Sequence, residues 1–379
     1  MFFHLNRGGV NDFLVVAFAL INSFIILSDD LRFMGMVVIF LLSMITFFLG
    51  FSLNFKIERG TFYLGVFVLV SLINVLYFPS LTSYAENKRI YFYFTLLIVF
   101  LLCSASDVYY RNYNIIFWGL FFVGVVYFFI SVGFKPSEEN ARVNELGLNP
   151  LILAKNVALL GVLSLFLPNK KYSYLLFYIA LLGVVATGSR GPFVILLLIL
   201  LMKFIFEKKY FYIFLSSIAI LFVIFFYDFF LSILPETFSS RLTGDSMRYQ
   251  FESNSGAERI DLYRIAYNLW ESNPIFGIGL GNYSYFAPLN APHNIYLEML
   301  AEMGVFFFVA FVFFILSSLY CGFVCIKRFN DCKLKGLFFV YIFFVLSMLI
   351  DGELTVQCFL LYYLGFIFLN IYYRRSRLC

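Results

Sequence analysis

Twelve apolar runs divide the chain, and each is close to the length of a helix that crosses a lipid bilayer. Crossing the hydrocarbon layer takes roughly 20 apolar residues in a helix. Hydrophobic residues make up 62% of the 379 residues and charged residues only 13%, so a water-soluble core cannot bury this surface. The sequence predicts an all-α, polytopic integral membrane protein with about twelve transmembrane helices, at residues 13–28, 33–53, 61–80, 90–105, 114–134, 151–168, 173–188, 192–207, 210–231, 303–325, 337–351 and 355–373.

Basic residues between these runs give the expected orientation. If both termini are cytoplasmic, the inner side carries 16 Lys and Arg residues and the short outer loops carry six. Cytoplasmic loops hold the excess of positive charge in membrane proteins. We therefore expect three parts: nine helices in 1–230, a long outer loop at 231–302, and three helices in 303–379. The basic runs are topology signals, and no nucleic-acid partner follows from them.

The long outer segment has a predicted helix of its own, in "SGAERIDLYRIAYNLWESNP". Ser255 followed by Glu258 forms a capping box, and Pro274 ends the helix. Helical spacing places an arginine and an aromatic stripe on one face. Either this helix lies on the bilayer with its arginine toward the headgroups, or the arginine binds a ligand. The residues of this face are Arg259, Tyr263, Ala266 and Trp270.

A glycine-rich stretch, "FGIGLGNYSYFAP", follows this helix. The spacing of Gly277, Gly279 and Gly281 is not that of a dinucleotide-binding loop, and no strand precedes it. We expect a tight loop in which backbone segments approach closely. None of the six cysteines lies in 231–302, so no disulfide framework is predicted there. The Cys321, Cys325 and Cys332 set lacks a second ligand pair, and no metal site is predicted.

Three basic side chains occupy predicted helix starts on the outer side. Arg190 lies in "TGSRGPFV", with Pro192 as the expected first helical residue. Arg259 lies in the first turn of the outer helix. His293 follows Pro292 in "NAPHNIYLEMLAEMG", where Pro292 is expected to set the first turn of the next helix. A cation at a helix N-terminus costs roughly 0.3–1 kcal/mol, and a bound phosphate removes that cost. The same dipole keeps an imidazole neutral, as a general base requires.

Each of these residues also has a plainer interpretation. The two arginines can mark a membrane edge, and a lone interfacial histidine is more often structural. Lower-ranked candidates are Lys155, which either faces a ligand or extends to the membrane surface, and Asp351 and Glu353, which either hold an acceptor hydroxyl or form a solvated turn. Neighbouring aromatic rings offer sugar-stacking surfaces, or belong to an interfacial belt; they are Tyr283, Tyr285, Phe286 and Tyr296.

The order "TGSRG", "GAERIDLYRIAYNLWESNPIFGIGLGNYSYF" and "PHNIYLEMLAEMG" resembles the O-antigen polymerase and ligase superfamily. The resemblance covers roughly residues 150–310 by motif and the rest by hydropathy. It implies that Arg190 and Arg259 contact the pyrophosphate of an undecaprenyl-linked glycan. His293, Asn294 and Gly304 match the family's histidine motif. Phe307 stands where ligases often carry a second glycine, which favours a polymerase.

The resemblance implies transfer of a glycan from undecaprenyl pyrophosphate to an acceptor hydroxyl, with His293 as the acceptor base and no metal or other cofactor. It also implies a bacterial inner-membrane protein whose active site faces the periplasm. Expected partners are the lipid-linked oligosaccharide and membrane lipid, with a chain-length regulator protein and a flippase as further candidates. The main alternative is a ligase that transfers the glycan to lipid A core. A lipid-linked oligosaccharide flippase is the distant alternative, and it predicts internal repeats and charges deep within several spans.

Overall fold

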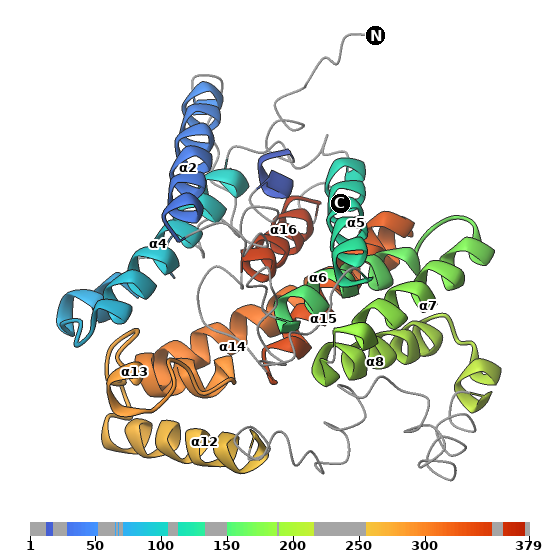
Figure 1. The fold of residues 1–379 in the computed structure, drawn as a ribbon. Coiled ribbons are helices and arrows are strands. Elements are labelled where there is room, and N and C mark those ends of the chain that lie inside the picture. The colour runs from blue at the N-terminus through green and yellow to red at the C-terminus, as the bar shows by residue number, and fades with distance from the viewer. Residues whose placement is uncertain are drawn as a thin grey trace. The chain divides into compact units, whose positions relative to one another are not determined.

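The computed structural model describes residues 13–17, 29–51, 65, 67, 71–104, 113–132, 150–187, 189–215, 255–350 and 359–375 (Figure 1). Every element within these ranges is a helix, which confirms the predicted all-α class. Among the described helices, Asn114–Val132 and Ile295–Phe329 are long and apolar enough to cross a membrane, and 34–45, 151–164 and 359–373 are shorter apolar helices.

The described helices follow the apolar runs closely. Much of the first, third and ninth predicted spans, the first residues of the twelfth and the last residues of several others lie outside the described residues. The remaining runs coincide with helices, and two additional helices fall in the long segment before the tenth run. The elements are α2 (Asp29–Phe51), α4 (Ser83–Ser104), α5 (Tyr113–Val132), α6 (Pro150–Ser164), α7 (Lys170–Ala186), α8 (Arg190–Phe206), α12 (Ser255–Ser272), α13 (Tyr283–Phe286), α14 (Ile295–Phe329), α15 (Cys332–Ser347) and α16 (Phe359–Arg375).

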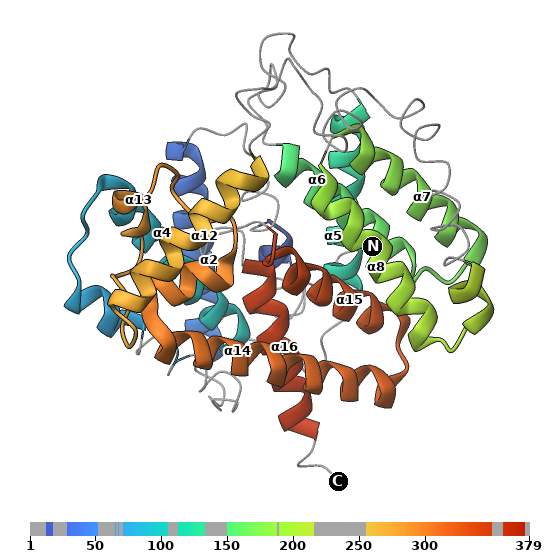
Figure 2. The same ribbon diagram turned by 90° about the horizontal axis from the view of Figure 1, so that it is seen from below.

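The chain forms two compact units, and one of them comprises residues 120–256. In this unit α6 packs against both α7 and α8 (Figure 2). A Cβ atom at Gly161 would lie 3.1 Å from Leu196 and 3.3 Å from Ala180, so the absence of a side chain lets these three helices approach. At the far end of α8, Lys203 Nζ donates a hydrogen bond of 2.6 Å to the carbonyl of Leu165.

The other unit comprises residues 1–119 and 257–379, which include α14. α14 packs against α15 and α16, α16 also packs against α4, and α4 packs against α2. Aromatic side chains fill this core. The buried ring of Tyr362 lies 6.5 Å from that of Phe92 and 6.2 Å from that of Phe311, measured between centroids.

Helix α12 packs on the first part of α14 through an apolar cluster. Leu262 and Ala266 of α12 are buried together with Tyr283 of α13 and Ala301 of α14. The buried line of α12 therefore differs from the predicted stripe: Tyr263 and Trp270 are only half-buried at its edge, and Arg259 is exposed. The apolar face of this helix covers protein, which corrects the alternative in which that face lies on the bilayer.

Candidate functional site

The start of α14 is set by the side chain of Asn294. Its Oδ1 atom accepts hydrogen bonds from the backbone N–H groups of Tyr296 (3.0 Å) and Leu297 (3.2 Å), so the helix begins at Ile295. This is an N-cap, which satisfies donors that the helix leaves unpaired. The prediction that Pro292 opens the helix is wrong, because the cap places it before the first turn. His293 is consequently the residue that immediately precedes the cap.

His293 has an uncommon backbone conformation. It is half-buried, with φ of 55°. The other non-glycine residues with positive φ in the described ranges are Lys208, which follows the C-cap residue of α8, and Asn330, which is the C-cap residue of α14. Left-handed residues are common there because they end helices. His293 instead precedes a helix, and non-glycine residues held in this conformation occur preferentially at functional sites.

The residues next to His293 are attached to the end of α15. Asn294 Nδ2 donates to the carbonyl of Leu349 at 3.2 Å. The N–H of Ile295 donates to the carbonyl of Met348 at 3.1 Å, and the Tyr296 hydroxyl donates to the carbonyl of Val345 at 3.4 Å. The segment before the last helix thus supports the histidine from one side. Asp351 and Glu353, which follow it, lie outside the described residues.

At a kink at Gly304, backbone groups of α14 pair with the glycine-rich loop instead of with the helix. Gly304 has φ of 78° and ψ of 178°, which interrupts the helix. Backbone groups near the kink then pair with the loop: Val305 N–H donates to Pro274 (2.8 Å), and the carbonyls of Ala301 and Glu302 accept from the N–H groups of Ile278 (3.0 Å) and Gly279 (2.8 Å). The loop and the kink therefore form one backbone-paired unit.

Two glycines make this pairing possible. A Cβ atom at Gly304 would lie 2.2 Å from the carbonyl oxygen of Ile275, and one at Gly277 would lie 2.4 Å from the carbonyl carbon of Glu302. Both residues have positive φ, which side chains disfavour. The close backbone approach predicted for the glycine-rich stretch is confirmed, and the glycine of the histidine motif gains a physical role.

Replacing Gly304 by alanine is expected to lower both the amount of folded protein and the yield of product. The new methyl group collides with backbone atoms, and the residue keeps a strained conformation that costs on the order of 1–3 kcal/mol before the collision. Thermal midpoint in detergent and product yield are the measurements. Gly65→Ala is the matched control, because among the described residues a Cβ there meets Phe100 alone, at 3.7 Å. Equal effects of both substitutions would contradict this role.

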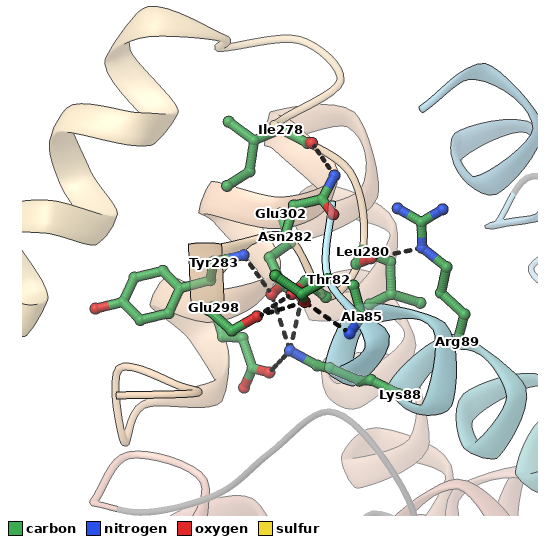
Figure 3. Close-up of polar contacts among 12 residues, drawn as sticks. Thr82, Ala85, Lys88, Arg89, Ile278, Leu280, Asn282, Tyr283, Glu298 and Glu302 are labelled. Atoms are coloured by element: carbon green, nitrogen blue, oxygen red, sulfur yellow. Dashed lines mark hydrogen bonds and ion pairs between the residues drawn. The ribbon is translucent and has the colours of Figure 1, made fainter. Parts of the chain in front are cut away.

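A buried ion cluster lies beneath the loop (Figure 3). Lys88 of α4 has its Nζ 2.5 Å from Glu298 Oε1 and 2.8 Å from Glu302 Oε1, and all three side chains are fully buried. Burial lowers the pKa of Lys88, but the charges of the two carboxylates and their hydrogen bonds outweigh it, so the pKa rises above its ordinary value. Lys88 therefore remains charged and joins α4 to two successive turns of α14.

Buried amides and a guanidinium attach the loop to the segment before α4. Asn74 accepts from the N–H of Leu280 (3.0 Å) and donates to the carbonyl of Phe276 (2.9 Å). Asn282 accepts from the N–H of Leu81 at 3.0 Å. Arg89 Nε donates to the carbonyl of Leu280 at 2.7 Å (Figure 3). Because buried polar groups are costly unless paired, these contacts fix one loop conformation.

Tyr283 links the ion cluster to α12. Its N–H donates to Glu302 Oε1 (3.3 Å), and its hydroxyl donates to the carbonyl of Leu262 (3.0 Å). Burial, followed by the charges of the two glutamates, raises the pKa of this hydroxyl. The ring is fully buried, so it offers no surface to a sugar, contrary to the predicted stacking role. The exposed rings of this segment are Tyr285 and Phe286.

The predicted site residues fall in both units. Arg259 is exposed near the start of α12, and His293 and Asn294 precede α14, in the unit that also holds the ion cluster. Arg190 and Lys155 belong to the other unit. Arg190 lies at the N-terminus of α8, as predicted, and it is exposed there. The helix begins at Arg190, after Ser189 as N-cap, so Pro192 is its third residue and not the predicted first one. Lys155 is half-buried within α6.

The residues that build the scaffold of this site were not predicted from the sequence. Glu298 and Glu302 are four residues apart in "IYLEMLAEMG", so both lie on one helix face. Carboxylates beside an apolar span require a partner, and the basic pair Lys88–Arg89 in a predicted outer loop was available as that partner. No group of three or more His, Cys, Asp or Glu side chains suited to a metal occurs within the described ranges.

Comparison with protein families agrees with the motif order. Residues 175–312 match the model of the O-antigen ligase family, a range that contains Arg190, Arg259, His293, Asn294 and Gly304. A comparison with curated proteins gives no match. The family comprises glycosyltransferase-like enzymes of surface polysaccharide processing. Residues 175–312 are therefore similar to the O-antigen ligase family, and this matched region together with the apolar helices indicates a membrane protein.

Proposed function

We propose that the protein polymerises lipid-linked repeat units of a surface polysaccharide in the bacterial inner membrane, at a site that faces the periplasm. The observation that carries this proposal is the left-handed His293, half-buried directly before the Asn294 cap. A helix N-terminus beside a histidine suits a base that works near an anionic ligand. The contacts among 74–89, 273–304 and 345–349, all near predicted outer loops, support one site on that side.

In the proposed reaction, the hydroxyl oxygen of an acceptor repeat unit bonds to the anomeric carbon of the donor glycan. The bond between that carbon and the pyrophosphate oxygen breaks, and undecaprenyl pyrophosphate leaves with the electron pair. His293 accepts the hydroxyl proton. Arg190 and Arg259 neutralise the leaving pyrophosphate, so the reaction uses no divalent metal. The acceptor is a second lipid-linked unit, and a chain-length regulator and a flippase are the proposed partner proteins.

Arg259→Ala is expected to reduce polymer length and yield strongly, because it removes a cation from the proposed pyrophosphate site. Loss of a hydrogen bond to a charged group costs roughly 1.5–3 kcal/mol, which corresponds to about a 10- to 150-fold lower rate. Gel laddering of surface polysaccharide at matched protein level is the measurement. Arg264→Ala on the same helix is the control, since Arg264 is exposed and pairs only with Asp261 at 3.3 Å among the contacts described. Similar ladders from both variants would count against the site.

A deletion strain separates polymerase from ligase. Loss of a polymerase leaves single repeat units on the lipid A core, whereas loss of a ligase leaves uncapped core and long lipid-linked chains. We expect single-unit caps. The ligase is the second candidate because both reactions use the same donor. Phe307, at the position where ligases often carry glycine, is buried with its ring 5.7 Å from that of Phe67, which favours the polymerase.

A further inference from the structure

Beyond the Gly304 kink, one side of α14 forms an exposed apolar stripe. Its members recur at three- and four-residue spacing, with exposed fractions between 38% and 68%, and they are Val305, Phe306, Val309, Phe313, Leu316 and Tyr320. The opposite side, including Phe307, Phe311 and Ile315, is buried. In a helix long and apolar enough to cross a membrane, a continuous stripe of this kind is the surface that contacts lipid.

The stripe continues into four apolar residues that lie outside the helix. We call them the apolar rim: Leu76, Tyr77, Ile275 and Phe276, with exposed fractions of 85%, 74%, 57% and 54%. Ile275 and Phe276 follow Pro274, whose carbonyl accepts the N–H of Val305 at 2.8 Å. The rim therefore borders the first residue of the stripe.

Internal contacts hold the rim in place. The ring of Tyr77 lies 6.4 Å from that of Phe276, measured between centroids. Asn74 Nδ2 donates to the carbonyl of Phe276 at 2.9 Å, which attaches the two halves of the rim to each other. Single exposed apolar residues are common on protein surfaces, whereas a group of large apolar side chains fixed together indicates a contact surface.

The outer face of α12 has the opposite character. Its exposed positions are mostly polar or charged, and they include Asp261, Arg264, Asn268 and Glu271. Such a face belongs in water. The same unit thus carries a water-facing helix and an apolar rim that is continuous with a lipid-facing stripe.

From this continuity we infer that the apolar rim inserts into the boundary between headgroups and acyl chains of the bilayer. The rim then anchors the glycine-rich loop to the membrane surface, as amphipathic interfacial segments do. One consequence rests on the proposed function: the anchor holds Arg259 and His293 near the depth of the headgroups, where the pyrophosphate of a lipid-linked donor lies. The anchoring itself does not require that function.

Depth-dependent quenching by brominated phosphatidylcholine tests the inference. Trp118 and Trp270 are the two tryptophans of the chain, so Trp118→Phe with Trp270→Phe gives a tryptophan-free background. Phe276→Trp is then introduced, the full chain is reconstituted in vesicles, and bromine is placed either near the headgroups or near the bilayer centre. We expect the strongest loss of fluorescence with the shallow bromine.

Two further positions calibrate the measurement. Phe313 lies eight residues beyond Val305, about 12 Å along the helix, so Phe313→Trp should respond most to bromine near the centre of a layer roughly 30 Å thick. Tyr267→Trp, on the polar outer side of α12, should respond weakly to both. Tyr77→Trp is a second rim variant if Phe276→Trp does not fold.

The outcomes separate the alternatives. An unquenched rim tryptophan beside a normally quenched Phe313→Trp overturns the inference; blue-shifted emission would then indicate a protein partner, and red-shifted emission would indicate water. A quenched rim in a protein that transfers no glycan supports the anchor and rejects the proposed function instead.

Discussion

Replacing His293 by asparagine is expected to abolish polymer formation while the protein accumulates normally. A general base contributes about 10²- to 10⁴-fold to a rate, so surface polysaccharide should fall to single repeat units. Asparagine is the informative substitution because it tolerates the left-handed conformation of this residue, with φ of 55°, better than alanine does. It therefore removes the base without adding backbone strain. The measurement is gel laddering from strains with matched protein levels.

Two further variants distinguish the loss of the base from a change in the backbone around it. His293→Gly relaxes the backbone fully and also lacks the base, so it should be inactive in the same way. Asn294→Ser keeps an N-cap side chain that can accept from Tyr296 and Leu297, and it should retain substantial activity if the cap is what positions the helix. Normal laddering from His293→Asn would remove His293 from the mechanism and leave its conformation without the proposed explanation.

Hydropathy predicted the positions of most described helices, because an apolar run long enough to cross a bilayer must be helical there. The predicted span 114–134 corresponds to α5 at Tyr113–Val132, and 337–351 corresponds to α15 at Cys332–Ser347. The predicted start of the tenth span, residue 303, lies next to the Gly304 kink. The Glu-bearing turns before that kink are also helical, so the element begins eight residues earlier, at Ile295. Apolar length detects the membrane part and misses the polar turns attached to it.

Proline was the wrong signal for the starts of two helices, α8 and α14. Proline suits the first turn of a helix, and both Pro192 and Pro292 were assigned that role. In the structure Ser189 and Asn294 occupy the N-cap positions. Pro192 is therefore the third residue of α8, and Pro292 lies two residues before the N-cap of α14. At α14 the Asn294 side chain accepts backbone hydrogen bonds and so satisfies donors of the first turn, whereas Ser189 precedes α8 with an extended backbone and without a capping hydrogen bond from its side chain.

The ion cluster was beyond sequence reasoning for a different reason. Lys88 and Glu302 are 214 residues apart, and no periodicity or local motif encodes which distant charges meet. The helical spacing of Glu298 and Glu302 calls for a cation, but it does not identify which one. The pairing emerges only when α4 and α14 are brought together by their packing.

Lys88→Met is expected to be the most destabilising single substitution in this unit. It leaves Glu298 and Glu302 buried side by side without the cation that lies 2.5 Å and 2.8 Å from them. Removing one partner of a buried ion pair costs about 3–5 kcal/mol. The pKa of Lys88 is raised above its ordinary 10.5, so its stabilising charge is fully present at neutral pH and is lost only as the pH rises through the folded-state pKa.

The thermal midpoint of the purified protein in detergent measures this effect. Lys171→Met is the matched control, because Lys171 is exposed at the start of α7 and surface substitutions usually change stability by less than about 0.5 kcal/mol. Combining Lys88→Met with Glu302→Gln should recover part of the loss, since one uncompensated charge is then removed. That recovery would show that electrostatics, rather than the shape of the lysine, connects α4 to the turns that lead from His293 to the kink. A Lys88→Met protein that melts with the wild type would instead mean that the two carboxylates are neutral in the folded protein.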